Sequence, residues 1–189
     1  MTVPDFSPAF TTPYQALLGG TYRQLHAHVR AAHETICAEG RVTVVHGTHV
    51  LTPFFVRAMN LPAPGNLQPT TLRVTIDRAS HAGDEPRMTW TRQIGDTRLD
   101  TRQFARGGRL VEVSGAGSIA FTLRVNGGAL FYEHSRSRLF AVPLPQALVP
   151  DVSACVSPLE NGWRVRVLIE WQGHLVCEYS GDIHPAGAL

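Results

Sequence analysis

Hydrophobic and polar residues alternate along most of the chain after residue 71, a pattern typical of strands that bury one face. Short turn sequences separate the alternating segments, among them Gly95-Asp96 and Gln172-Gly173. Consecutive strands joined by tight turns lie side by side, so the pattern predicts an antiparallel meander. The expected strands cover residues 72–78, 87–94, 97–104, 109–114, 118–125, 129–136, 163–171 and 175–181.

The first third of the chain predicts helices instead. Apolar residues recur three or four positions apart over residues 13–39, and Gly40 would end that helix. A short strand is expected over residues 41–47. A second helix is expected over residues 52–60, with Thr52 as its cap, and a loop follows it.

Together these elements predict an α+β fold. We expect a curved antiparallel sheet of about seven or eight strands, forming a half or full barrel, with the N-terminal helices packed on its concave side or mouth. The chain is expected to be a single domain over residues 1–189, helical over 13–60 and mainly β over 71–184. A helix-grip fold is the alternative, but such folds close with a long C-terminal helix, whereas this chain ends in a strand pattern.

Prolines interrupt the strand pattern once, over residues 139–151. Pro143, Pro145 and Pro150 bar ordinary strand pairing, so this segment must leave the sheet. Its apolar residues predict that it lies against the sheet and covers an opening.

The two-residue loop at Gly95-Asp96 sets the register of its hairpin and so defines an inward face. It predicts three inward pairs: Met88 with Gln103, Trp90 with Thr101, and Arg92 with Leu99. A second such loop at Gly107-Gly108 places Gln103 opposite Glu112. Pairing across Asn126-Gly127 places Phe121 opposite Tyr132 and Ile119 opposite His134.

This inward face is the candidate site, because a few polar groups in an apolar shell can orient a ligand. Its expected lining is Trp90, Arg92, Thr101, Gln103, Glu112, Tyr132 and His134. Arg92 would bind a carboxylate or phosphate. Two alternatives stay open: Arg92 and Glu112 form an internal ion pair stacked against Trp90, and His134 is a hydrogen-bonded core histidine.

The composition excludes several other classes. All 17 basic residues are arginine, but a net charge of +2 is too small for nucleic-acid binding. No apolar run or leader predicts a membrane or secreted protein, so we expect a cytoplasmic one with three reduced cysteines. The spacings of His26, His28 and His33, and of His46 and His49, do not fit a metal site, and we expect neither metal nor cofactor.

Several segments together resemble the bacterial family known as domain of unknown function 4166. They are YQALLG, AEGRVTVVHG, MTWTRQIGDTRLDTRQ, GGRLVEVSG, VNGGALFY, VPLPQALVPDVSA and EYSGDI, and they span nearly the whole chain. The family implies no established reaction, but its members are often fused to a dehydrogenase-like domain. This chain has no G-x-G-x-x-G motif of its own, so such a partner would be a separate polypeptide.

Three functions follow. The first is binding of a small, partly apolar, acidic ligand in the sheet cavity. The second is an isomerase or hydrolase acting on such a ligand, with Glu112 or His134 as the base. The third is an accessory domain that docks on a dehydrogenase-like protein through residues 143–150.

Overall fold

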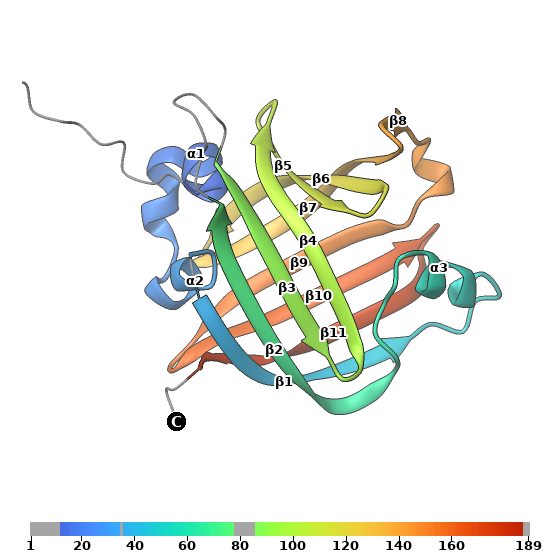
Figure 1. Cartoon of the computed structure of the whole chain (residues 1–189), viewed down its shortest axis with the longest axis horizontal. Helices are drawn as coiled ribbons and strands as arrows, with labels where there is room; N and C mark the ends of the chain where they lie inside the picture. Colours follow the sequence, from blue (N-terminus) through green and yellow to red (C-terminus); the bar gives the residue numbers. More distant parts are fainter. Residues whose placement is uncertain (1–11, 35, 78–85, 187–189) are drawn as a thin grey trace, which may run out of the picture.

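Antiparallel strands dominate the computed structural model, which describes residues 12–34, 36–77 and 86–186 (Figure 1). The strands are β1 Ile36–His46, β2 Gly65–Asp77, β3 Arg87–Ile94, β4 Thr97–Arg106, β5 Arg109–Ser114, β6 Gly117–Asn126, β7 Ala129–Leu139, β8 Val142–Pro143, β9 Asp151–Leu159, β10 Gly162–Trp171 and β11 His174–Pro185. The helices are α1 Pro13–Leu18, α2 Ala27–Ala31 and α3 Thr52–Ala58, with 3₁₀ turns η1 Gly19–Gln24 and η2 Gln146–Leu148.

The described strands form a closed barrel. Their order is β6-β5-β4-β3-β2-β1-β11-β10-β9-β7, and β6 also pairs with β7, which joins the two ends into a ring of ten strands. Strand β8 is a two-residue extension beside β7. The barrel is therefore larger than the expected seven or eight strands, although the antiparallel meander is confirmed.

Strand β9 was not expected as a strand at all, and two of the expected strands are longer than predicted. Strand β1 begins at Ile36, inside the segment expected to be helical, and β2 begins at Gly65, inside the expected loop. Gly40 does not end a helix but lies within β1, where a Cβ atom would be 2.1 Å from the carbonyl oxygen of Asp182 on β11. Because Gly40 has no side chain, β1 and β11 can lie this close together.

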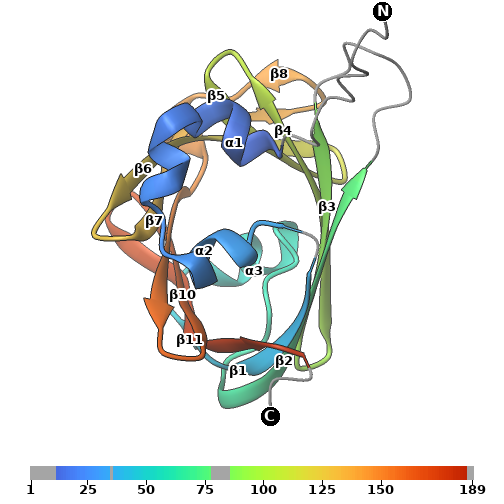
Figure 2. The ribbon, with the colours of Figure 1, turned by 90° about the vertical axis from the view of Figure 1, so that its left-hand side faces the viewer.

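The helices cover the two ends of the barrel (Figure 2). Helix α1 contacts β4 and β5, and α2 contacts β9 and β10, whereas α3 packs on β11 at the other end. Thr12 and Gln15 form a capping box that starts α1. Thr52 lies inside α3 and not at its cap, which is Leu51. None of the helices in the described ranges has the length and apolar character needed to cross a membrane.

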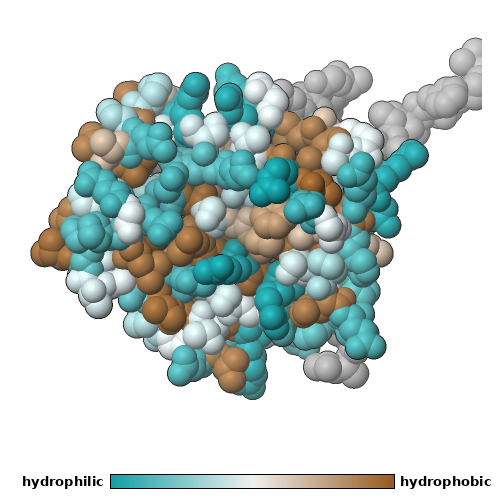
Figure 3. All heavy atoms as spheres, turned by 180° about the vertical axis from the view of Figure 1, so that it is seen from behind, coloured by the Kyte–Doolittle hydropathy of each residue, from teal (hydrophilic) through white to brown (hydrophobic). Residues whose placement is uncertain are grey.

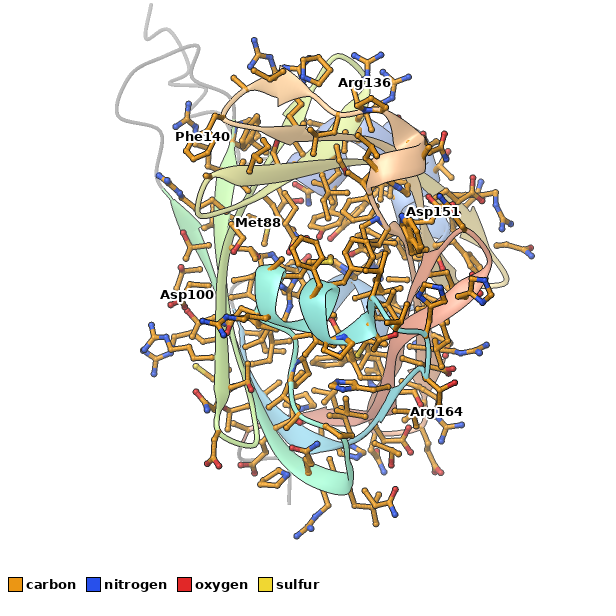
Figure 4. The ribbon with its side chains drawn as sticks, turned by 90° about the vertical axis from the view of Figure 1, so that its right-hand side faces the viewer. Met88, Asp100, Arg136, Phe140, Asp151 and Arg164 are labelled. Atoms are coloured by element: carbon orange, nitrogen blue, oxygen red, sulfur yellow. The ribbon has the colours of Figure 1, made fainter. Side chains whose placement is uncertain are left out.

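Apolar side chains from all sides of the ring form the core. Met88, Val74 and Leu110 are fully buried, whereas Asp100 and Arg164 lie outside the ring (Figure 4). Polar and apolar side chains are mixed over the face seen in Figure 3. Outer ion pairs such as Arg164–Asp182 are exposed and contribute little to stability.

The segment after β7 follows the expectation in part. It leaves the barrel at the β7–β8 hairpin, forms η2, and returns to the ring at Asp151. The side chains of Trp171 and Gln172 both donate to the carbonyl oxygen of Ala147, at 3.2 and 3.3 Å, and hold the segment against the β10–β11 hairpin.

Candidate functional site

An ion pair lies inside the barrel, between Arg92 on β3 and Glu112 on β5. Arg92 Nη1 is 3.0 Å from Glu112 Oε1 and also donates to Thr101 Oγ1 at 3.3 Å. Gln103 Nε2 donates to Glu112 Oε2 at 2.7 Å. The guanidinium carbon of Arg92 lies 5.0 Å from the ring centroid of Trp90. These five predicted residues therefore do come together, in the ion-paired arrangement that the sequence left as an alternative.

The hairpin registers explain this arrangement. Trp90 pairs with Thr101, and Gln103 pairs with Glu112, as predicted from the two tight turns. Arg92 and Glu112 then reach each other across β4, which lies between their strands.

Charge and burial oppose each other in this pair. Burial alone would raise the pKa of Glu112, but Arg92 and the hydrogen bond from Gln103 outweigh it and hold that pKa below its ordinary value. Burial lowers the pKa of Arg92, and Glu112 more than compensates, so the net shift is upward. Glu112 is thus held as a carboxylate that accepts a proton poorly.

A chain of hydrogen bonds connects this ion pair to the end of the barrel that α1 and α2 cover. Tyr14 OH donates to Gln103 Oε1 at 2.5 Å, and Tyr132 OH lies 3.1 Å from Tyr14 OH. His33 Nε2 is 2.6 Å from Tyr132 OH, and His33 Nδ1 is 2.6 Å from the carbonyl oxygen of Val29. This polar cluster comprises Tyr14, His33, Trp90, Arg92, Thr101, Gln103, Glu112 and Tyr132.

The directions of these hydrogen bonds show that the polar cluster has one proton fewer than its contacts require. Gln103 must present its NH₂ to Glu112, so its oxygen accepts from Tyr14, and Tyr14 then accepts from Tyr132. His33 therefore has to donate to Tyr132 and also to the Val29 carbonyl, which requires a doubly protonated ring. Burial lowers the pKa of His33 to about 4, so at neutral pH the ring is neutral and one contact has no proton.

Part of the cluster remains accessible although it lies inside the barrel. The side chain of Arg92 is 20% exposed and that of Glu112 is 19% exposed. Arg92 uses only Nη1 in its hydrogen bonds with the described residues. Among the described residues, the buried side-chain polar atoms without a hydrogen-bond partner are Thr52 Oγ1 and Trp90 Nε1. Arg92 Nε and Nη2 do not belong to this group, so they are unpaired but accessible to solvent.

Tyr179 on β11 completes this accessible group. It pairs with Val44 and Val167, whose side chains are buried in the core, so its ring also points inward. Burial raises its pKa to about 12, and Arg92 acts electrostatically on it in the opposite direction. Its hydroxyl forms no hydrogen bond with the described residues. Like Arg92 Nε, it is not among the buried atoms without a partner, so it is accessible to solvent.

His134 lies apart from the polar cluster. The β6–β7 register differs from the prediction by two residues, because the turn is at Gly127-Gly128: Leu123 faces Tyr132 and Phe121 faces His134. Tyr132 joins the polar cluster, whereas His134 binds Asp151 and Ser137.

Two surface hollows lie elsewhere. The larger, about 860 Å³, is on the outer side of β1, β2, β10 and β11, and its Arg164 is paired with Asp182. The smaller, about 370 Å³, lies beside α3 and includes His46 and His49. His46 hydrogen-bonds to the carbonyl oxygen of Pro62 and His49 stacks on His174. Neither hollow contains a residue of the polar cluster.

The sequence did not indicate Tyr14, His33 or Tyr179 as site residues. Tyr14 lies in α1 and His33 directly follows α2, and both reach the cluster only because these helices pack on the barrel. Only Tyr179 gave a signal, since it alternates with buried residues in a predicted strand.

Comparisons with known proteins place the chain in a family. The profile of the family described as Domain of unknown function (DUF4166) matches residues 18–183. The chain belongs to this family. No curated protein matches the chain. Among solved structures, secretory abundant heat soluble protein 4 from Ramazzottius varieornatus is 13% identical, with a TM-score of 0.39, over 80% of this chain and 93% of that one. Similarity at that level supports no inference on function.

Proposed function

We propose that the barrel binds a small, partly apolar, acidic ligand whose anionic group contacts Arg92. The observation that carries this proposal is that Arg92 Nε and Nη2 have no hydrogen-bond partner among the described residues, while a fifth of the side chain remains accessible. Those two atoms form the edge through which a guanidinium binds a carboxylate in a bidentate way.

The surroundings of Arg92 fit such a ligand. Both carboxylate oxygens of Glu112 are already bound, by Arg92 and Gln103, so they leave the free edge of the guanidinium unoccupied. Tyr179 offers a further hydroxyl. Partly buried apolar residues pack against the core on other strands, including Ile119 and Val165, and suit an apolar ligand body.

An anionic, partly apolar fluorescent probe, 8-anilinonaphthalene-1-sulfonate, tests the proposal in competition with straight-chain carboxylates. The informative variant is Arg92→Met combined with Glu112→Gln, because it removes both charges and leaves neither one buried alone. We expect probe affinity to fall at least tenfold. Arg98→Met, at an exposed position beside Asp100, is the matched control and should bind as the wild type does. Equal affinity in the folded double variant and the wild type would refute the role of Arg92.

A second candidate function is docking on a dehydrogenase-like protein through the segment after β7. Large apolar side chains there face solvent: Phe140 is 77% exposed, Val142 62% and Leu148 65%. Exposed apolar groups gathered in one segment are typical of a contact surface. Co-purification with such a protein from the same host should be lost in Phe140→Asp and kept in Leu67→Asp, an equally apolar exposed position elsewhere.

A further inference from the structure

Three side chains outside the polar cluster form a second hydrogen-bonded group. His134 Nδ1 lies 2.6 Å from Asp151 Oδ1, and His134 Nε2 lies 2.9 Å from Ser137 Oγ. The imidazole is 4% exposed and Ser137 is 8% exposed, whereas Asp151 is largely open to solvent. A serine, a histidine and a carboxylate are thus bonded in that order, with the histidine in the middle.

A β-bulge brings the serine and the histidine together. In the β6–β7 ladder Ala120 pairs with Arg136 and the next residue, Phe121, pairs with His134, so Ser135 has no partner. Without that extra residue, side chains three positions apart in a strand would point to opposite faces. The bulge lets His134 and Ser137 meet on one face, and such bulges re-aim side chains next to active sites.

The aspartate lies just beyond the end of the short β7–β9 ladder. Strands β7 and β9 pair only over Leu130–Tyr132 on β7. Beyond Tyr132 the two strands are no longer paired, and Asp151, the first residue of β9, contacts His134 there (Figure 4 labels Asp151).

The partners of His134 decide which ring nitrogen carries the proton. The Asp151 carboxylate can only accept, so the neutral ring carries its proton on Nδ1. Nε2 then presents its lone pair to Ser137, whose hydroxyl donates. A histidine oriented by a carboxylate and accepting from a serine is the arrangement that activates a serine nucleophile.

We propose that Ser137, His134 and Asp151 form an acyl-transfer site that hydrolyses esters with an apolar acyl group. Ser137 Oγ would attack the ester carbonyl carbon while its proton moves to His134 Nε2. The bond from that carbon to the alkoxy oxygen breaks, and His134 returns the proton to the departing alcohol. Water, activated by His134, then attacks the acyl-serine and releases the carboxylic acid and free Ser137.

The surroundings of Ser137 set the substrate class. Ser137 faces Ile119 across the β6–β7 ladder, and His134 faces the buried Phe121. The amide of Leu144 donates to the carbonyl oxygen of Ser137 at 3.1 Å, which places the segment after β8 beside the serine. An apolar neighbourhood with little exposed surface fits a short, slender acyl chain better than a peptide.

The alternative is that the three residues only hold β7 and β9 together beyond their ladder. A covalent probe separates the two roles, because a purely structural serine does not react with an alkyl fluorophosphonate. We expect the probe to label the wild-type chain once, on Ser137, with fluoride released, as located by peptide mass spectrometry. The chain should also release nitrophenol from 4-nitrophenyl butanoate.

Variants make the test specific. Ser137→Ala should lose both labelling and hydrolysis, and His134→Gln should slow both by about a hundredfold, which is the scale of general-base catalysis. Ser135→Ala, the neighbouring exposed serine, should behave as the wild type does. If His134→Gln fails to fold, Asp151→Asn replaces it and should slow labelling at least tenfold. A folded wild-type chain that is unlabelled, labelled at another residue, or no more active than Ser137→Ala would overturn the proposal.

Discussion

Arg92 and Glu112 depend on each other, because each carries a charge inside the barrel that the other neutralises. Both are mostly buried, and between them they bind Thr101 and Gln103. Removing one member of such a pair is costlier than removing both, since it leaves an uncompensated charge.

A double-mutant cycle on this pair measures that dependence. We expect Arg92→Met to lower the free energy of unfolding by about 3 kcal/mol, the lower end of what breaking a buried pair costs. Adding Glu112→Gln should restore part of the loss. Urea unfolding of the four proteins gives the coupling energy, and additive effects would show that the pair does not couple.

His33 makes the stability of the protein depend on pH. Its ordinary pKa is 6.5 and burial lowers it to about 4, so between these values the unfolded chain binds a proton that the folded chain does not. Stability is full above pH 6.5 and falls as the pH decreases toward 4. The loss at pH 4 should be about 3 kcal/mol, since one pKa unit corresponds to roughly 1.4 kcal/mol.

Unfolding measured from pH 7.5 to 4 checks this expectation. His33→Gln should flatten the dependence in that interval. An unaltered pH profile in His33→Gln would mean that other groups set it.

Residues in one hairpin were predictable, and residues that meet through the tertiary fold were not. The tight turns gave Trp90, Arg92 and Gln103 a common face, because a two-residue loop allows one register. Ser137 and Asp151 are 14 positions apart and both reach His134, the first through a bulge in β7 and the second because the β7–β9 ladder ends at Tyr132. Neither of those features has a distinct pattern in the sequence.

At the scale of elements, β1 shows why the helical prediction failed. Three- and four-residue spacing of apolar residues continues past the true helices, but Ile36–His46 pairs with β2 on one side and β11 on the other. Those two ladders outweigh local helix propensity, which is a weak preference. Gly40 looked like a helix end, although its small size instead serves strand contact.

Replacing glycines by alanine tests this role of Gly40. Gly40→Ala should destabilise the protein by at least about 2 kcal/mol, because its Cβ atom would overlap the Asp182 backbone and strain the β1–β11 contact. Gly20→Ala is the control, since open space surrounds that position in η1 and alanine favours helical backbone. Equal melting temperatures for the two variants would contradict the close-contact explanation.

At the scale of the whole molecule, closure of the ring is what the sequence predicted least well. Alternation indicated a meander and a curved sheet, but it did not predict β9, Asp151–Leu159, which is one of the ten ring strands. Closure pairs β1 with β11 and β6 with β7, and it leaves the ten ring strands with neighbours on both sides. Such a ring offers no long unpaired edge for aggregation.

The wall of this ring has very unequal strength around its circumference. The β6–β7 ladder runs through ten residue pairs, whereas the β7–β9 ladder has three. Amide protons exchange with solvent where a few bonds must break, so those joining β7 to β9 should exchange in D₂O well before those joining β6 to β7. Mass spectrometry of deuterated peptides from the two ladders would record that order. Transient opening of the barrel would then begin beside His134, and small molecules would reach the interior there first.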